Sequence, residues 1–311
     1  MLPIPSLYLA FPNFNMVAVP LGADPPGIDF QHHRCGAHVV LALKAHTSIQ
    51  IQFRLPGGYL LIGHMHRAGS RSRLDGAALT TGHSFTVLPK SECDIILGKG
   101  TSASIILAYM EGWPDDGGAR RGSPWHRSAL PWSASHALAD VALGELHEDV
   151  LGCLRKHGDD QRHDACEQRI QNLVICHGSS NPCVEEQVDC EPVISHRCRY
   201  FIFRRTVQFM VDNLHKEIYV SELCEAALVS ERTLRYAFEH VVGLSPTRYL
   251  FYLRLGSACR DLMLARPNRV SVASIALKRG MWDLSRFAGG YRRVFGEYPS
   301  DTLRRRLAEV A

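Results

Sequence analysis

Hydrophobic and polar positions alternate through much of residues 39–110, and turn-forming residues interrupt the pattern at short intervals. The clearest stretch covers 48–55 and ends at a Pro-Gly-Gly turn. Its apolar positions are Ile49, Ile51, Phe53 and Leu55. A period of two is typical of strands that bury one face. Further short runs at 59–62, 84–88, 94–97 and 102–109 predict a small barrel or jelly-roll sandwich built from many short strands.

The apolar spacing changes to steps of three and four residues between Ala137 and Leu154, and again from Ile170 to Val174. This period predicts a pair of amphipathic helices. Such helices can pack on the strand region or on a second copy of the chain, and periodicity is compatible with both. Residues 178–192 are polar and contain two prolines, which predicts a linker.

Beyond residue 196 the pattern is strongly helical, and the sequence repeats itself at a spacing of 52 to 53 residues. The first copy contains Leu223, Leu234, Phe238, Gly243 and Pro246, which correspond to Ile275, Phe287, Tyr291, Gly296 and Pro299 in the second. Each copy has a short helix, a tight turn with a capping residue (Ser230 or Asp283), and a second helix whose apolar residues lie four apart. This is the plan of a helix-turn-helix.

A long helix is predicted between the two copies, over residues 245–265. Ser245 is a favourable N-cap and Pro246 a favourable first residue. A helix of about twenty residues spans roughly 30 Å, which is close to the ~34 Å repeat of a DNA duplex. A spacer of this length would let both second helices enter successive major grooves.

Charge is divided unevenly along the chain. The net charge of +4 hides a value of +9 for residues 196–311, where 20 Lys and Arg face 11 Asp and Glu, and −5 for the remainder. This asymmetry indicates that the C-terminal third binds a polyanion.

The first twenty residues carry no charge and contain four prolines, so they lack the pattern of a secretory signal. No apolar stretch reaches membrane-spanning length. We therefore expect a cytoplasmic protein with no membrane partner, whose ten cysteines are reduced and form no structural disulfides.

Residues 203–306 carry motifs that resemble the DNA-binding domain of the AraC/XylS family of transcription regulators. The motifs are 228–234 (LVSERTL), 243–250 (GLSPTRYL), 253–255 (LRL), 258–264 (ACRDLML), 275–277 (IAL) and 295–299 (FGEYP). They cover about a third of the chain in the order and spacing of the family. The preceding two thirds resemble the family only in layout, because many members place a cupin-like strand domain and linking helices there.

The resemblance implies that Arg232, Arg235 and Tyr236 read bases in the first copy. Arginine suits this role because its guanidinium can donate two hydrogen bonds to guanine. The alternative is that both arginines contact only phosphates or solvent.

The second copy departs from the family pattern, because its exposed face has little side chain to reach a base. Only Ser285 and Arg286 can hydrogen-bond there, and the adjacent Gly289 and Gly290 indicate either a close backbone approach or a weak helix. We expect the first copy to read most of the sequence and the second to anchor on phosphates. The predicted DNA-binding residues are Arg232, Arg235, Tyr236, Arg248, Ser285, Arg286, Gly289 and Arg292, and other basic residues expected on this face are Arg254, Lys278, Arg279, Arg293 and 304–306.

His64 and His66 resemble the start of a cupin metal motif, but the Glu expected a few residues later is missing and two arginines follow. We therefore expect no metal and no cofactor, and assign both histidines to an effector-binding cavity. Five cysteines around residues 166–198 lack the close pairing of zinc sites.

The sequence as a whole predicts an α+β protein with a cupin-like β-barrel or jelly-roll domain at 1–120, linking helices and linker at 121–195, and an all-α domain with two helix-turn-helix units at 196–311. The expected function is that of a DNA-binding transcription regulator and not an enzyme, most simply an activator that responds to a small-molecule effector. Expected partners are double-stranded DNA, RNA polymerase and a second copy of the chain. The alternatives are a cupin-type enzyme fused to a DNA-binding tail and an effector-blind dimeric regulator.

Overall fold

The computed structural model describes residues 2–3, 8, 14–22, 27–110, 132–134, 141–156, 159–179, 190–265 and 270–310. The strands are β1 (Leu2–Pro3), β2 (Asn15–Pro20), β3 (Gly27–Cys35), β4 (His38–Ala45), β5 (Ile49–Arg54), β6 (Tyr59–Arg67), β7 (Arg73–Leu74), β8 (Ala77–Ala78), β9 (Ser84–Val87), β10 (Glu92–Leu97), β11 (Ser102–Tyr109) and β12 (Trp132–Ala134). The strand runs predicted after residue 48 are confirmed, whereas β2 and β3 lie before the alternating region.

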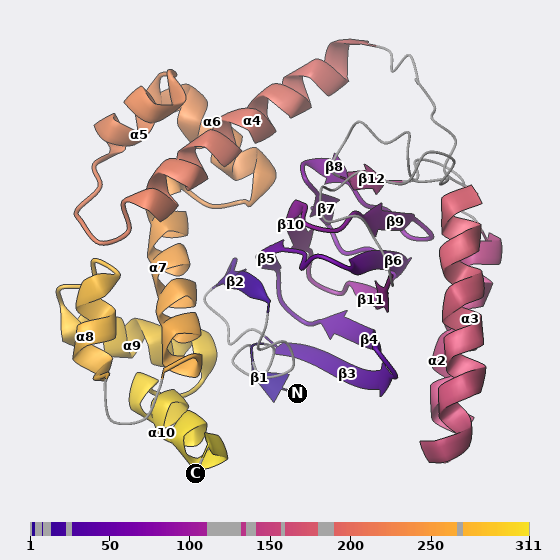
Figure 1. Ribbon diagram of the computed structural model, residues 1–311. Coiled ribbons are helices and arrows are strands. Elements are labelled where there is room, and N and C mark those ends of the chain that lie inside the picture. Colours follow the sequence, from indigo (N-terminus) through magenta and orange to yellow (C-terminus); the bar gives the residue numbers. More distant parts are fainter. Residues whose placement is uncertain are drawn as a thin grey trace. The chain divides into compact units, whose positions relative to one another are not determined.

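The strands form two antiparallel sheets (Figure 1). One has the order β1-β3-β4-β11-β6-β9-β12 and the other β2-β5-β10-β7-β8. β11 is central in the larger sheet, where Ile106 pairs with Val40 of β4 and with Ile62 of β6. The closed barrel of a cupin is not confirmed, because the described strands divide into two sheets.

The burial of β5 differs from the prediction that its polar residues face solvent. Gln50 is fully buried, whereas Ile51 and Phe53 are only half-buried. The reason is a hydrogen bond of 2.8 Å in which the Tyr249 hydroxyl donates to Gln50 Oε1. A polar strand residue can be buried when a partner satisfies it.

Two helices pack on the larger sheet: α2 (Val141–Lys156) and α3 (Asp159–Ser179). Figure 1 shows them side by side. Val150, Ile170 and Leu173 are fully buried in one cluster with Ile62 and Ile106 of the sheet. Of the two arrangements left open by the sequence, packing on the strand region is therefore present within the chain.

The chain divides into two compact units. The first comprises Met1, Ile28–His46 and Gln52–Glu186, and the second Leu2–Gly27, Thr47–Ile51 and Gln187–Ala311. The predicted linker at 178–192 lies largely at 180–189, outside the described residues, and its ends belong to helices. Of the predicted domain bounds, 120/121 also lies outside the described residues, and 195/196 falls within a continuous helix, α4 (Cys190–Asp212).

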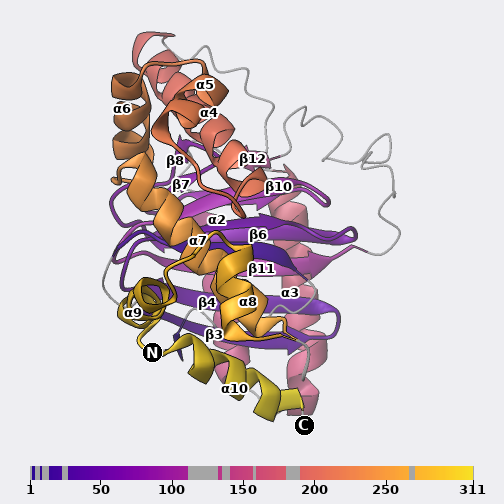
Figure 2. The same cartoon turned by 90° about the vertical axis from the view of Figure 1, so that its left-hand side faces the viewer.

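The remaining helices of the second unit are α5 (Val220–Ala227), α6 (Glu231–Val241), α7 (Pro246–Met263), α8 (Val272–Lys278), α9 (Leu284–Phe295) and α10 (Pro299–Val310). Within this unit α4, α5 and α6 surround the first end of α7, while α8, α9 and α10 surround the other (Figures 1 and 2). Tyr249 of α7 packs edge-on against Phe203 and Phe238, with ring centroids 5.4 Å from each. α7 is thus the common core element of both helix-turn-helix units.

The repeat predicted from the sequence is confirmed by conformation as well as by burial. Leu234 and Phe287 are both buried, and Gly243 and Gly296 end α6 and α9 with φ angles of 71° and 78°. Positive φ favours glycine because it lacks a Cβ atom. Among the described helices, none combines the length and hydrophobicity needed to cross a bilayer.

The second unit also contains the N-terminal strand β2, which packs on α7. The backbone of Gly256 approaches β2 so closely that an added Cβ would lie 2.3 Å from the Ala18 carbonyl oxygen. Arg260 of α7 donates a hydrogen bond of 2.6 Å to Asn15. The strand β2 therefore contributes to the core of the helical unit.

Candidate nucleic-acid interface

The first helix-turn-helix consists of α5, a short turn and α6. Leu228 ends α5 in the left-handed conformation, with φ 58°. Ser230 caps α6 by accepting a hydrogen bond from the Thr233 amide. These two features direct α6 so that Leu234 and Phe238 are buried, and the opposite face of the helix remains accessible.

Arg232, Arg235 and Tyr236 all lie on this exposed face of α6, as the prediction requires. Arg232 donates a hydrogen bond of 3.3 Å to the Tyr236 hydroxyl, and its guanidinium carbon lies 5.5 Å from the ring centroid. Arg235 is paired with Glu231 at 2.7 Å. Because this pair is exposed, breaking it costs little, and both arginines can exchange their present partners for an external acceptor.

The second helix-turn-helix consists of α8, its turn and α9. Gly280, with φ 66°, takes the left-handed position that Leu228 takes in the first copy. Asp283 caps α9 by accepting a hydrogen bond of 2.9 Å from the Arg286 amide. Phe287 and Tyr291 are buried, while Ser285 and Gly289 are exposed. The second turn thus also uses a left-handed residue and a capping side chain, but one more residue separates the two than in the first turn.

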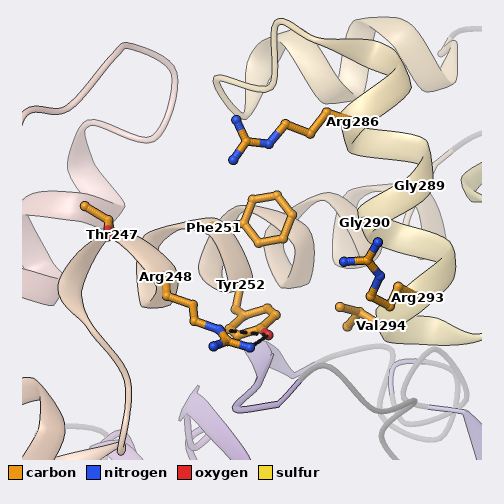
Figure 3. A pocket seen from close by; sticks show the side chains of 9 residues that line it. All are labelled: Thr247, Arg248, Phe251, Tyr252, Arg286, Gly289, Gly290, Arg293 and Val294. Atoms are coloured by element: carbon orange, nitrogen blue, oxygen red, sulfur yellow. Dashed lines mark hydrogen bonds between the residues drawn. The ribbon is translucent and has the colours of Figure 1, made fainter.

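A hollow of about 680 Å³ lies between α7 and α9 (Figure 3). Its lining residues are Thr247, Arg248, Phe251, Tyr252, Arg286, Gly289, Gly290, Arg293 and Val294. The Arg286 guanidinium carbon lies 5.9 Å from the centroid of the Phe251 ring, and Arg248 donates hydrogen bonds of 3.3 and 3.4 Å to the Tyr252 hydroxyl. The hollow therefore combines an aromatic floor with a basic rim, a feature that sequence reasoning missed.

Several of the basic residues expected on the DNA face have partners within the protein. Arg279 forms a bidentate pair with Asp261, at 2.7 and 2.8 Å. Arg254 donates to the Lys216 carbonyl oxygen, and burial lowers the pKa of its guanidinium. Arg292 donates a hydrogen bond of 2.6 Å to the Tyr298 hydroxyl. Arg279 and Arg254 thus stabilise the fold, whereas the exposed Arg292 stays a predicted contact.

His64 and His66 lie together with a third histidine, His147 of α2, which no sequence motif indicated. The ring centroid of His64 lies 4.9 Å from that of His66 and 5.4 Å from that of His147. Ser104 Oγ lies 3.0 Å from His66 Nε2 and 2.7 Å from His147 Nδ1. Ring nitrogens of these histidines are thus engaged with protein groups. Within the described part of the chain, no set of three or more His, Cys, Asp or Glu side chains is arranged to hold a metal ion.

Comparisons with known proteins agree on the C-terminal third. Residues 223–305 match the model of a helix-turn-helix domain. A XylDLEGF operon transcriptional activator of Pseudomonas putida is 42% identical over 109 residues, which cover 35% of this chain and 34% of that protein. The XylDLEGF operon transcriptional activator 3 of Pseudomonas putida is 44% identical over 106 residues, which cover 33% of this chain and 31% of that protein. The match thus spans about a third of the length of these curated relatives.

Among solved structures, a probable AraC family transcriptional regulator from Rhodopseudomonas palustris is 30% identical. The similarity covers 34% of this chain and 97% of that structure, with a TM-score of 0.32.

Proposed function

Because the C-terminal third of this chain is a helix-turn-helix domain of the AraC/XylS family, we propose that the whole protein is a transcription regulator that acts by binding double-stranded DNA. The relatives named above are transcriptional activators, so activation through contact with RNA polymerase is the mode we propose. The protein would work where the genome is accessible, in the cytoplasm, and would have no catalytic activity.

The observation that carries this proposal is the exposure of one face of α6 and one face of α9, the recognition helices of the two helix-turn-helix units, while the opposite face of each is buried. α7 lies between the two helix-turn-helix units and, with 18 residues, is about 27 Å long at 1.5 Å per residue. That length is of the same order as one turn of B-form DNA, ~34 Å, which separates successive major grooves on one side.

The two helix-turn-helix units would have different roles in DNA binding. Arg232, Arg235 and Tyr236 of α6 offer side chains long enough to reach base edges. On α9, Ser285 is short and Arg286 lies against Phe251, so this helix, together with Arg248 and Arg292, would contribute mainly phosphate contacts.

Substitutions in the two recognition helices test this division. Full-length protein is used to select a binding site from a random duplex pool, and each base pair of that site is then varied. We expect Arg232→Ala to weaken binding about tenfold or more and to relax preference at one or two positions. Ser285→Ala should preserve the preferences. Arg169→Ala removes an equally charged, exposed side chain on α3, outside the helix-turn-helix units, and serves as the control. Equal loss of base discrimination in Arg232→Ala and Ser285→Ala would contradict the division.

For the strand region we propose a cupin-like sensing and dimerisation domain at 1–120, joined through 121–195 to the DNA-binding domain at 196–311. The histidine cluster around His64 and His66, in which His64 and His147 are buried, supports an effector site in this region, because polar groups are concentrated there among apolar strands. A thermal-shift screen of metabolites should find selective stabilisation of the wild type that is lost in His64→Leu. Dimerisation is tested by sedimentation with and without such a ligand.

A further inference from the structure

The hollow between α7 and α9 contains two adjacent glycines whose surroundings differ. A Cβ atom on Gly290 would lie 2.7 Å from Cζ of Phe251, whereas one on Gly289 would meet no atom of the described residues within 4 Å, apart from its chain neighbours and the backbone of α9 itself. Gly290 is therefore required by packing inside the protein. Gly289 is not, although glycine is among the least favourable residues in a helix interior.

Open space at Gly289 adjoins a strongly basic rim. Arg248, Arg286 and Arg293 all line the hollow and are exposed (Figure 3). Arg248 and Arg286 lie against aromatic rings of α7, which fixes their guanidinium groups beside the opening. No acidic side chain is among the lining residues, so the hollow favours an anion with an uncharged, partly apolar body.

We propose that this hollow receives the sugar–phosphate backbone of one DNA strand, and that Gly289 is the position that leaves room for it. This inference rests on the DNA-binding function proposed above. Deoxyribose would lie over Phe251 and Gly289, and the flanking phosphates would accept hydrogen bonds from the arginines. Arginine binds phosphate in a bidentate manner, and a close backbone approach needs a residue without a side chain.

Filling the hollow tests the proposal. Gly289→Ala and Gly289→Leu add side chains of increasing size at a position where the described residues of other elements leave open space. We expect both variants to fold, and Gly289→Ala to melt about 2–4 °C higher because alanine favours the helix. Affinity for the selected duplex, measured by fluorescence anisotropy, should fall several-fold for Ala and about tenfold or more for Leu, which corresponds to ~1.4 kcal/mol.

Gly152→Ala and Gly152→Leu provide the matched control. Gly152 lies in the middle of α2, and a Cβ there also meets no atom within 4 Å. These variants should bind DNA as the wild type does. If these substitutions act only through helix stability, they should leave the affinity for DNA unchanged both at Gly289 and at Gly152.

If the hollow binds the sugar–phosphate backbone, the affinity of the Gly289 and Arg293 variants should also depend on DNA sequence and on salt in a distinctive way. Gly289→Leu should weaken binding to the selected site and its base-pair variants by the same factor, since a sugar–phosphate contact carries no base information. Arg293→Ala should reduce the slope of log affinity against log salt by about one.

The possible failures are distinguishable. If the wild type selects no duplex, the proposed function itself is wrong. If the wild type binds and Gly289→Leu binds equally well, the function stands and the proposal that the hollow binds the backbone is overturned. A change of base preference in Gly289→Leu would also overturn it, because that result would place a base edge at Gly289.

Discussion

Leu228 occupies a backbone conformation that suits glycine. Its φ of 58° is left-handed, and 75% of its surface is exposed. In a non-glycine residue this conformation costs about 1–2 kcal/mol. The corresponding turn of the second helix-turn-helix has Gly280 instead. The first turn therefore keeps a locally unfavourable residue whose side chain contributes little burial.

Replacing this residue should stabilise the protein. Leu228→Gly is expected to raise the free energy of unfolding by roughly 0.5–1 kcal/mol, because relief of the left-handed strain exceeds the added chain entropy of glycine. Urea denaturation measures the change. Leu228→Ala retains a Cβ atom and should stay close to the wild type, so an equal gain in both variants would show that the backbone conformation is not the cause.

Single residues also show where reasoning from sequence succeeded. Ser230 and Asp283 were predicted as caps and are caps, because capping depends on residues three positions away. Gln50 was predicted to face solvent and is buried, since its partner Tyr249 lies 199 positions further along the chain. The stacking of Arg286 on Phe251 was not predicted for the same reason. Local interactions can be read from a sequence, whereas these contacts depend on the tertiary fold.

At the scale of an element, the start of α5 depends on a carboxylate. Glu222 Oε2 accepts a hydrogen bond of 2.8 Å from the Tyr219 amide, and Lys216 lies 3.4 Å from Oε1. The Tyr219 amide is the larger cause, and with Lys216 it lowers the pKa of Glu222 below the ordinary 4.5. A lowered pKa in the folded state means that ionised Glu222 stabilises the fold above the unfolded pKa.

This linkage predicts a stability difference that depends on pH. Glu222→Gln should be less stable than the wild type at pH 7, and the gap should close as the pH falls through 4.5 towards the lowered pKa of the folded protein. Urea unfolding at several pH values between 7 and 3 measures it. Glu225→Gln, on the same helix and exposed, is the control. A gap that persists at pH 3 would indicate a packing effect instead of a charge effect.

Among the elements, the helices of the C-terminal third were predicted most closely. α7 was expected over 245–265 and extends over Pro246–Met263, because cap, proline and apolar period all agree there. The strands β3 and β4 of the larger sheet were harder to predict from the sequence. β3 and β4 are joined by a tight turn, and β4 is buried on both faces for much of its length, so it lacks the alternation that identifies a half-buried strand.

At the scale of the whole molecule, the sequence repeat indicated the helix-turn-helix units correctly, but no pattern indicated that residues 14–20 belong to the same compact unit. The contact of Gly256 with Ala18 carries that association.

Gly256→Ala should lower the free energy of unfolding by about 1–3 kcal/mol, since the added carbon would overlap the backbone of β2. Gly152→Ala, which has open space, should be neutral or stabilising. If the two substitutions gave the same result in urea, β2 would not be packed on α7.

The attachment of β2 to α7 has a consequence for domain exchange. A chimaera that joins residues 196–311 to a foreign sensor would separate α7 from Ala18 and Gln50, and so leave Gly256 and the Tyr249 hydroxyl without the strand that covers them. The transferred fragment would then expose to water the face of α7 that β2 covers around Gly256. Supplying the strand as a separate peptide of residues 8–22 offers a way to restore such a hybrid.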